Sequence, residues 1–324
     1  MTARPDARPR SLVIGEALID AVTRTTATSS SRAEPGQTVE HVGGSPANVA
    51  FGLAALEHDV DLATWLATDE RGLRIAEICQ ARGVGLTPGS QGAPFTSVAH
   101  ARLDPTGAAT YVFDLEWQLA AVPQLETYGH VHIGSIGAVL EPGAGMVRAT
   151  ALTARARSTV SYDPNARPSL MGRPVDARRT IEAAMALSDV VKLSDEDVAW
   201  LCPGEELADV LQRWCALGPA LMLVTRGGDG TTVRVGRTGE MGEFPAPRVN
   251  VVDTVGAGDS FMAGLVSGLL DAGLLGSPDA RTALTAVTLD DVRPAVERAL
   301  ATGALTVGQA GAHAPTRADL GAMP

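Results

Sequence analysis

Short apolar runs rich in β-branched residues alternate with longer segments of helical periodicity along most of the chain. The apolar runs predict strands at 11–15, 60–67, 130–134, 159–163, 189–193 and 221–225. The segments between them predict helices over 46–57, 70–82, 142–157, 176–187 and 204–217. Strands that alternate with helices build βαβ units, whose sheet is mostly parallel and covered on both faces. The pattern therefore predicts a Rossmann-like three-layer α/β sandwich with a mostly parallel central sheet.

Two regions interrupt this alternation, because they contain predicted strands without a helix between them. One is 34–42, and the other is 96–115, where TSVAHARL and ATYVFDL flank the turn sequence DPTGA. Proline and glycine in such a turn favour a β-hairpin. We therefore expect a small, discontinuous β lid over a main α/β domain. The predicted boundaries are 21–43 and 96–119 for the lid, 11–20, 44–95 and 120–324 for the main domain, and 1–10 for a loose N-terminal tail.

Charge and cysteine content exclude several classes of protein. The chain has 324 residues, 26 of them basic and 37 acidic, and its net charge of −11 argues against nucleic-acid binding. Cys79, Cys202 and Cys215 show no CxxC spacing, which is typical of a reduced cytoplasmic protein. The first ten residues are too polar for a signal peptide, and no apolar run approaches the ~18 residues of a membrane helix. We therefore expect a soluble cytoplasmic protein.

The basic residues include a single lysine, Lys192, and all the others are arginine. A Walker A loop requires Gly-Lys-Ser/Thr, whereas Lys192 is followed by Leu193. The HRD and DFG strings of protein kinases do not occur, and Schiff-base chemistry would have to use Lys192 itself. A site for nucleotide phosphates in this chain would therefore depend mostly on backbone amides, arginine and metal.

The sequence VVDTVGAGDSFMAGLVSGLL, residues 251–270, predicts a glycine-rich turn that opens a helix. At such a helix start, free amides and the helix dipole favour an anion. A dinucleotide-binding fingerprint is excluded, because GxGxxG would need glycine where Phe261 stands. In the first helical turn, Asp259 can accept a proton from a hydroxyl that attacks a bound phosphate. The alternative is a tight turn in which Asp259 serves only the helix terminus.

A second glycine-rich segment, GGSPANVAFG, begins at residue 43. Gly43 and Gly44 allow a backbone to approach a ligand closely, and Asn48 lies in the first turn of the predicted helix. Polar atoms at this position suit sugar hydroxyls better than an apolar substrate. Taken alone, the segment is equally consistent with an ordinary glycine turn before a helix.

Several other polar residues need interpretation. His130 and His132 share one face of a predicted strand, but no third metal ligand lies nearby in the sequence, so a metal site is not expected. His58 is interpreted as a surface or lid residue. Arg167 follows a predicted strand end, the edge at which such sheets bind ligands, and is therefore a candidate substrate contact.

Together the two glycine-rich segments resemble the signatures of the ribokinase-like (PfkB) carbohydrate kinase family. The resemblance extends over almost the whole chain, from GEALID at 15–20 to GAHAPTRADL at 311–320. Its most specific part is DTVGAGDSF. Four segments look most like fructokinases: GEALID, GGSPAN, YDPNARPSL at 162–170 and VKLSDED at 191–197.

The resemblance implies a role for each matching residue. Asp259 corresponds to the catalytic base, and the anion hole for the transferred phosphoryl group corresponds to Gly256, Ala257 and Gly258. In the family, sugar hydroxyls are held at the positions of Asp20, Gly43, Gly44 and Asn48. The nucleotide is contacted by a strand-loop that matches TRGGDG, at Thr225, Gly227 and Gly230, and Lys192 is expected near the same nucleotide.

Three departures from the family pattern affect the expected cofactor site. The family's NxxE motif, which is linked to magnesium and phosphate placement, is replaced by Ser194-Asp195-Glu196-Asp197. Ser194 and Glu196 are therefore assigned to the nucleotide side, and either Glu196 or Asp197 to the water shell of Mg²⁺. His313 stands where similar sequences often have asparagine. Some relatives bind a monovalent cation at the positions of Asp253 and Val255, which makes K⁺ a further candidate.

We therefore predict an ATP-dependent kinase that phosphorylates a primary hydroxyl of a sugar, with fructose as the preferred candidate. Three alternatives stay open: a kinase for 2-keto-3-deoxygluconate or another sugar acid, a nucleoside kinase, and a non-catalytic sugar or nucleotide sensor. A sugar acid would require an arginine for its carboxylate, and Arg167 is the candidate. Exposed edges of the lid strands favour a homodimer through the lid.

Overall fold

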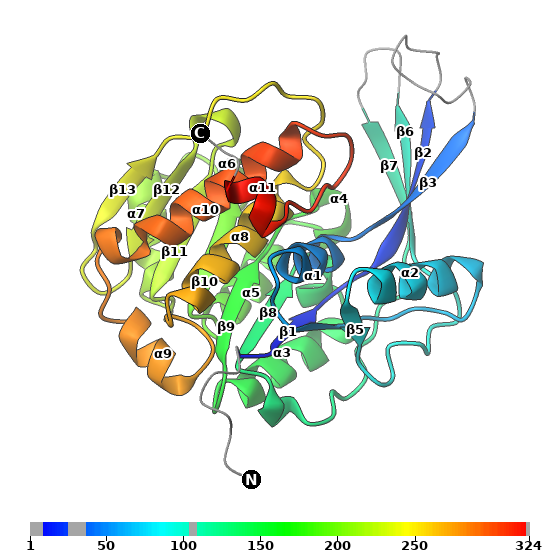
Figure 1. Ribbon diagram of the computed structural model, residues 1–324, viewed down its shortest axis with the longest axis horizontal. Coiled ribbons are helices and arrows are strands. Elements are labelled where there is room, and N and C mark those ends of the chain that lie inside the picture. Colours follow the sequence, from blue (N-terminus) through cyan, green and yellow to red (C-terminus); the bar gives the residue numbers. More distant parts are fainter. Residues whose placement is uncertain (1–8, 25–36, 104–108, 322–324) are drawn as a thin grey trace.

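The computed structural model describes residues 9–24, 37–103 and 109–321. A nine-stranded sheet forms its centre, in the order β13-β12-β11-β10-β9-β8-β1-β4-β5 (Figure 1). The strands from β5 to β11 in this order pair in parallel, whereas β12 and β13 pair antiparallel at one edge. Its strands are β1 (Ser11–Ile14), β4 (Val60–Ala63), β5 (Val84–Leu86), β8 (His130–Gly134), β9 (Thr159–Asp163), β10 (Val190–Ser194), β11 (Leu221–Thr225), β12 (Thr231–Val235) and β13 (Met241–Phe244).

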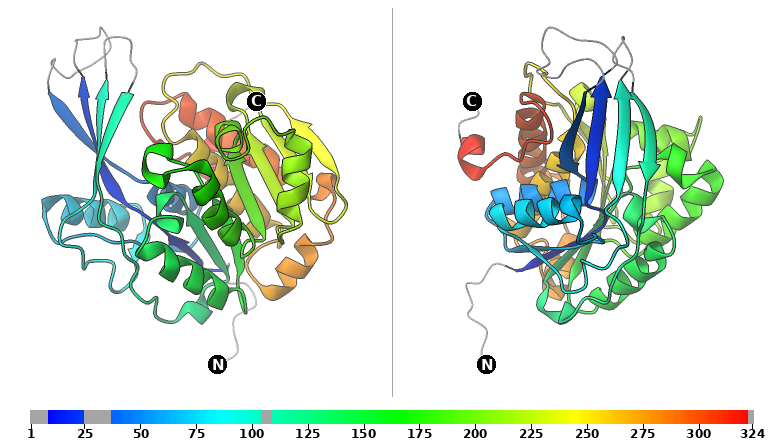
Figure 2. Two further views of the ribbon diagram at one scale, coloured as in Figure 1. Left: turned by 180° about the vertical axis from the view of Figure 1, so that it is seen from behind. Right: turned by 90° about the vertical axis from the view of Figure 1, so that its right-hand side faces the viewer.

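Helices cover both faces of this sheet, which confirms the predicted three-layer sandwich. One face carries α1 (Ser45–Ala55), α8 (Ala257–Asp271) and α10 (Leu289–Val307), which lie in front of the sheet in Figure 1. Figure 2 shows from behind the helices of the opposite face, among them α3 (Gly143–Ala154), α5 (Pro174–Met185) and α7 (Leu207–Cys215). Each helical layer buries its own cluster of apolar side chains against the sheet, so burial of both sheet faces stabilises the domain. The remaining helices are α2 (Glu70–Ala81), α4 (Pro168–Met171), α6 (Asp195–Leu201), α9 (Pro278–Leu284) and α11 (Arg317–Gly321).

A second, four-stranded sheet projects from the main body in the order β3-β2-β6-β7. It contains β2 (Leu18–Arg24), β3 (Thr38–Gly43) and the predicted hairpin of β6 (Val98–Leu103) and β7 (Ala109–Asp114). The turn 104–108 lies outside the described residues, as do residues 1–8 of the predicted tail. The chain passes from β1 into β2 within three residues, so Leu18 to Asp20 belong to this small sheet rather than to the main domain.

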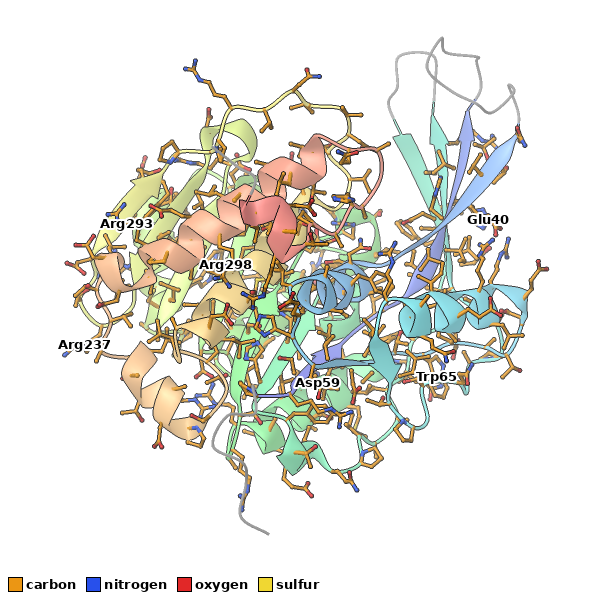
Figure 3. The ribbon with its side chains drawn as sticks, in the orientation of Figure 1. Glu40, Asp59, Trp65, Arg237, Arg293 and Arg298 are labelled. Atoms are coloured by element: carbon orange, nitrogen blue, oxygen red, sulfur yellow. The ribbon has the colours of Figure 1, made fainter. Side chains whose placement is uncertain are left out.

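The small sheet is tied to the main domain by charged side chains. Glu40 on β3 accepts hydrogen bonds from Arg71 and Arg74, which are three residues apart and therefore lie on one face of α2. The Arg74 bond is 2.7 Å long, and Figure 3 labels Glu40 where β3 passes α2. Because these side chains are partly exposed, the pairs contribute little to stability.

Two sequence predictions differ from the observed elements. The predicted strand 60–67 ends at Ala63, and Leu66 forms an isolated bridge to Gln91 instead. The helix α6 was not predicted, because it has only seven residues and its start depends on a capping box rather than on apolar periodicity. Among the described residues, no helix combines the length and apolar composition needed to cross a bilayer.

Glycines bring the helices of the site face close together. A side chain at Gly52 of α1 would lie 2.6 Å from Ala263 Cβ of α8. On the other side of α8, a side chain at Gly268 would lie 2.6 Å from Ala295 Cα of α10. These glycines therefore allow α8 to pack closely against both α1 and α10.

Candidate active site

Asp259 lies in the first turn of α8, at the junction with the first turn of α1. Ser45 Oγ donates a hydrogen bond of 2.7 Å to Oδ1 of Asp259, and Asn48 Nδ2 donates one of 2.8 Å to Oδ2. The residue is 7% exposed, so protein atoms surround most of its carboxylate. Two donors from a neighbouring helix fix the orientation of this carboxylate, as a general base requires.

Asn48 and Ser45 differ in how well the sequence predicted them. Asn48 was assigned to sugar hydroxyls, and its amide instead contacts the carboxylate of Asp259. Ser45 was not predicted at all, although its place in the GGSPAN segment, at the first position of α1, was a usable signal. The contacts of both residues with Asp259 depend on the packing of α1 against α8, which a local sequence pattern does not predict.

The glycine-rich turn before Asp259 has the predicted form. Gly256 is the N-cap residue of α8 and has φ 76°, a left-handed conformation that favours glycine. A side chain at this position would also lie 2.9 Å from Ala312 Cα of the C-terminal segment. The amide of Ala257 makes a long, 3.3 Å hydrogen bond to the Thr254 carbonyl, so it is weakly engaged. The first amides of a helix have no intrahelical acceptor, which suits this turn to an anion.

Lys192 of β10 lies next to Gly258 of this turn. A side chain at Gly258 would lie 3.1 Å from Lys192 Nζ. The ammonium is 4% exposed and donates a hydrogen bond of 3.0 Å to Asp163 Oδ2 at the end of β9. Lys192 is therefore a buried residue under the N-terminus of α8, not a solvated lysine at a strand end.

Asp20 and Gly43 lie on paired strands of the small sheet. A side chain at Gly43 would overlap the Asp20 carboxylate, so glycine is needed beside it. Burial raises the pKa of the Asp20 carboxyl to about 6, although Arg167 and His41 lower it, and Asp259 raises it further. Asp20, Arg167 and Asp259 therefore lie within electrostatic range of one another. Of the predicted sugar contacts, Gly44 lies beside Gly43 as the N-cap residue of α1, with φ 101°.

The raised pKa of Asp20 predicts a measurable effect on stability. Because the pKa rises from 3.8 in the unfolded chain to about 6 in the folded protein, ionisation of Asp20 lowers the free energy of unfolding by up to about 3 kcal/mol. This loss is complete above pH 6, decreases between pH 6 and pH 4, and is absent below pH 4. Asp20→Asn should therefore raise Tm by a few degrees at pH 8, and the gain should shrink at pH 5. Thermal unfolding at both pH values, with exposed Asp279→Asn as the control, measures this difference. A gain that is equal at both pH values would contradict it.

Glu16 is a buried carboxyl that sequence reasoning missed. One of its oxygens accepts a 3.1 Å hydrogen bond from the Gly137 amide, and burial raises its pKa to about 7 against the lowering effect of a hydrogen bond from Ser135. The sequence could have indicated it, because Glu16 is an acidic residue within the otherwise apolar segment that joins β1 to β2. Glu16 therefore connects the segment between β1 and β2 to the segment after β8.

Arg167 lies just past the end of β9, as predicted. Its Nη1 donates a 2.7 Å hydrogen bond to Asn165 Oδ1 and two longer bonds to the carbonyls of Asn165 and Ala166. The guanidinium is exposed and is electrostatically coupled to both Asp20 and Glu16. Its charge therefore lies within electrostatic range of Asp20 and Glu16.

The segment that replaces NxxE forms a helix cap. Ser194 Oγ accepts a 3.0 Å hydrogen bond from the Asp197 amide, and Asp197 Oδ2 accepts one of 2.9 Å from the Ser194 amide. The other oxygen of Asp197 accepts a 2.8 Å bond from the Ala166 amide. Asp197 thus holds the loop after β9 to the start of α6, whereas Glu196 is exposed. The geometry favours Glu196 over Asp197 as the residue available to a hydrated metal.

The predicted nucleotide residues occupy the β11–β12 turn. Thr225 Oγ1 donates a 3.3 Å hydrogen bond to the Leu193 carbonyl, and Gly227 is exposed in the turn. Gly230 has φ 101°, and a side chain there would overlap the Phe244 carbonyl. Close packing against the backbone of Phe244 therefore requires glycine at position 230, whether or not this residue also contacts a ligand.

Asp253, Val255 and His313 lie on the segments that flank the glycine-rich turn. Both oxygens of Asp253 accept backbone hydrogen bonds, of 3.1 Å from Val255 and 2.9 Å from Gly311. These bonds join the segment before α8 to the C-terminal segment. The His313 carbonyl accepts hydrogen bonds from Ser260 and Thr306, so its backbone anchors the same segment.

The strand histidines form a buried hydrogen-bonded ladder. His130 pairs with Thr159 and Ser161, and His132 with Ser161, each at 2.9 Å. Within the described part of the chain, no group of three or more His, Cys, Asp or Glu side chains is arranged to hold a metal ion. The prediction for His58 was wrong, because this residue is 5% exposed and pairs with Ser267 of α8.

A family model and curated relatives match most of this chain. A family model described as pfkB family carbohydrate kinase matches residues 8–319. A fructokinase from Klebsiella pneumoniae is 35% identical over 77% of this chain and 82% of its own length. One from Escherichia coli is 32% identical over 95% of this chain and 97% of its own.

Solved structures share the fold over nearly the whole length. A fructokinase from Xylella fastidiosa with bound ATP superposes with a TM-score of 0.81 at 24% identity, covering 97% of both chains. A Vibrio cholerae fructokinase double mutant, in a form with bound fructose, ADP and potassium, has a TM-score of 0.77 at 25% identity. It covers 98% of this chain and 99% of its own.

Proposed function

The chain belongs to the PfkB family of carbohydrate kinases, and from this premise we propose that it transfers the γ-phosphoryl group of ATP to the primary hydroxyl of fructose. The observation that carries this proposal is the buried carboxylate of Asp259, oriented by Ser45 and Asn48 at the start of α8. Identities of 30% or more to several curated fructokinases support fructose as the acceptor.

In the proposed reaction, Asp259 accepts the proton of the attacking hydroxyl. The amides of the turn 256–258 donate to the oxygens of the phosphoryl group, whose charge is spread over them during transfer. This division of roles requires no Walker-type lysine loop. Closure of the small sheet over the sugar would exclude water, which would otherwise compete as the acceptor.

We propose that the sugar binds between the small sheet and the carboxyl end of the central sheet. Asp20 would accept hydrogen bonds from sugar hydroxyls, with Gly43 and Gly44 allowing the close approach. Arg167 lies within electrostatic range of Asp20. Its exposed guanidinium supports a second candidate, a sugar acid such as 2-keto-3-deoxygluconate, because arginine pairs well with carboxylates.

ATP and Mg²⁺ are the proposed cofactors. The ATP would contact the β11–β12 turn at Thr225 and Gly227. Mg²⁺ usually retains several waters and takes one or two carboxylates besides substrate phosphates, and the exposed Glu196 fits that requirement. When bound, the metal neutralises phosphate charge. A monovalent cation near Asp253 and Val255 stays part of the proposal, which the potassium-bound relative supports.

We also propose a cytoplasmic protein, since Cys79, Cys202 and Cys215 are free thiols. Homodimerisation through the lid stays a proposal as well. It is supported by the edge strand β7, on which Val112 is 62% exposed.

A coupled assay of ADP release tests the proposed function. The purified protein, with ATP and Mg²⁺, should release ADP at the highest kcat/KM with fructose, and more slowly with 2-keto-3-deoxygluconate or adenosine. Arg167→Ala should selectively impair a sugar acid if the carboxylate binds there, because the charge pair is then lost. No sugar-dependent ADP release from any substrate would contradict a catalytic role and favour a sensor. An equal effect of Arg167→Ala on fructose and sugar acids would exclude the pairing.

A further inference from the structure

The connections between the small sheet and the main domain meet at one place. They are residues 15–17 between β1 and β2, Gly44 before α1, residues 87–97 before β6 and the segment that follows β7. A side chain at Gly44 would lie 2.5 Å from the Glu16 carbonyl, so the second connection packs on the first. The Ser97 hydroxyl accepts a 3.1 Å hydrogen bond from the Glu116 amide, which joins the third connection to the fourth. The connections therefore share one base.

Gly137, in the 3₁₀ turn Ile136–Ala138 after β8, binds the first and the last of these connections. Its amide donates a 3.1 Å hydrogen bond to Glu16 Oε2, and its carbonyl accepts one of 2.9 Å from Trp117 Nε1. Glu16 and Trp117 are 6% and 7% exposed, so both bonds are shielded from water. One residue of the main domain thus anchors the chain where it enters the small sheet and where it leaves it.

The surroundings of Gly137 leave little freedom for this base to shift. A side chain at Gly137 would lie 2.9 Å from Gly15 Cα and 3.0 Å from the Trp117 ring. A side chain at Gly143, at the start of α3, would overlap the same ring, so Trp117 is packed between two glycines. Ser135 has φ 55°, which is unfavourable for a residue with a side chain and persists only where surrounding contacts enforce it.

The orientation of the small sheet at this base determines where its sugar-binding candidate lies. Asp20 follows Glu16 by four residues on β2. Because the connections share one base, a rotation there moves Asp20 together with the rest of the sheet. The two hydrogen bonds to Gly137 oppose such a rotation, since breaking either one leaves a buried polar group without its partner.

We propose that the backbone of Gly137 is the pivot about which the small sheet turns, and that Glu16 and Trp117 are positioning residues that hold the sheet on this pivot. They keep Asp20 in register with Asp259 while the sheet closes over the sugar. This inference rests on the proposed kinase function. It extends that function from residues that contact the sugar to residues that place those contacts.

Trp117→Phe tests the carbonyl side of the pivot, because it removes the indole donor and keeps an aromatic ring between the glycines. The KM for fructose should rise about tenfold or more, since misplacing a binding group by about 1 Å can cost 10²-fold. The Kd for ADP should change little, because the candidate nucleotide residues lie on other elements. Water should also reach the phosphoryl group, so the variant should release more than one ADP for each sugar phosphate formed.

Glu16 tests the amide side of the same backbone. Glu16→Ala removes the acceptor of the Gly137 amide and should reproduce both effects of Trp117→Phe. Glu16→Gln should restore the wild-type KM and the ratio of one ADP per sugar phosphate, because the oxygen of glutamine can still accept from Gly137. Parallel assays of ADP and of sugar phosphate measure the ratio, and thermal unfolding confirms that each variant is folded.

The matched control is Trp214→Phe. Trp214 is fully buried, and its Nε1 donates a 2.9 Å hydrogen bond to Glu182 Oε1. It lies on α7, at the end of the central sheet away from the small sheet (Figure 1). This variant loses a comparable hydrogen bond and should lose stability, but it should keep the wild-type KM and release one ADP per sugar phosphate.

The outcomes separate the two proposals. If either folded variant, Trp117→Phe or Glu16→Ala, has the wild-type KM for fructose and releases one ADP per sugar phosphate, the pivot is overturned and the kinase function stands. Equal changes in Trp214→Phe would also overturn it, by reducing Glu16 and Trp117 to a general structural role. Wild-type protein without sugar-dependent ADP release contradicts the kinase function itself.

Discussion

Asp259→Asn is expected to lower kcat by roughly 10²–10⁴-fold, the typical contribution of a general base. Asparagine has the shape of aspartate and can still accept from Ser45, so α1 and α8 should stay packed. It cannot take up the proton of the sugar hydroxyl. Steady-state kinetics with fructose, together with calorimetric Kd values for ADP and fructose, should therefore show a loss of turnover with binding retained.

The control for Asp259→Asn is Asp279→Asn. Asp279 also lies in the first turn of a helix, α9, but it is exposed at the end of the molecule away from the small sheet (Figure 1). The control should have wild-type kinetics. Near-normal turnover in Asp259→Asn would exclude Asp259 as the base and would assign proton removal to another group or to water.

Gly43→Ala is expected to lower kcat/KM for the sugar by about 10²-fold or more, the cost of misplacing a binding group by about 1 Å. The new methyl group would overlap the Asp20 carboxylate, so that Asp20 must move relative to Asp259. Because the nucleotide residues lie on other elements, the Kd for ADP should change little. Kinetics at varied fructose and at varied ATP separate the two effects.

Gly145→Ala is the matched glycine control. Gly145 lies in α3 on the opposite face of the sheet, where a methyl group would make ordinary contact at 3.4 Å. Alanine there should stabilise the helix slightly and leave kinetics unchanged. Unchanged fructose kinetics in Gly43→Ala would show that Asp20 is not a sugar contact in this protein.

The sequence predicted the fold well where elements have strong local signals. Six apolar runs identified strands of the central sheet, and the hairpin of β6 and β7 followed from its Pro-Gly turn. Short elements such as β5 and α6 were missed, because three to seven residues carry too little periodicity, and the 19-residue helix α10 was missed as well. The start of the small sheet at Leu18 was predicted three residues too late, since the pairing of β2 with β3 and β6 is a long-range property.

In the candidate site, too, local features were predicted from the sequence and long-range contacts were not. The glycine-rich turn and Asp259 are contiguous in sequence, so their geometry follows from local helix capping and was predicted. The contacts to Asp259 come from residues more than 200 positions away, through packing of α1 on α8. Asp197 was read as a candidate for metal coordination, and its two oxygens bind backbone amides of its own helix start and of the loop after β9.

The lone lysine illustrates what each level determines. Composition by itself excluded a lysine-based phosphate loop, and the DTVGAGDSF segment indicated that backbone amides replace it. Only the tertiary structure brings Lys192 of β10, Asp163 of β9 and Gly258 of α8 together, because neighbouring parallel strands end at the same sheet edge and α8 starts above them. Sequence determines the local chemistry of each segment, whereas burial and charge pairing arise where segments distant in the chain meet.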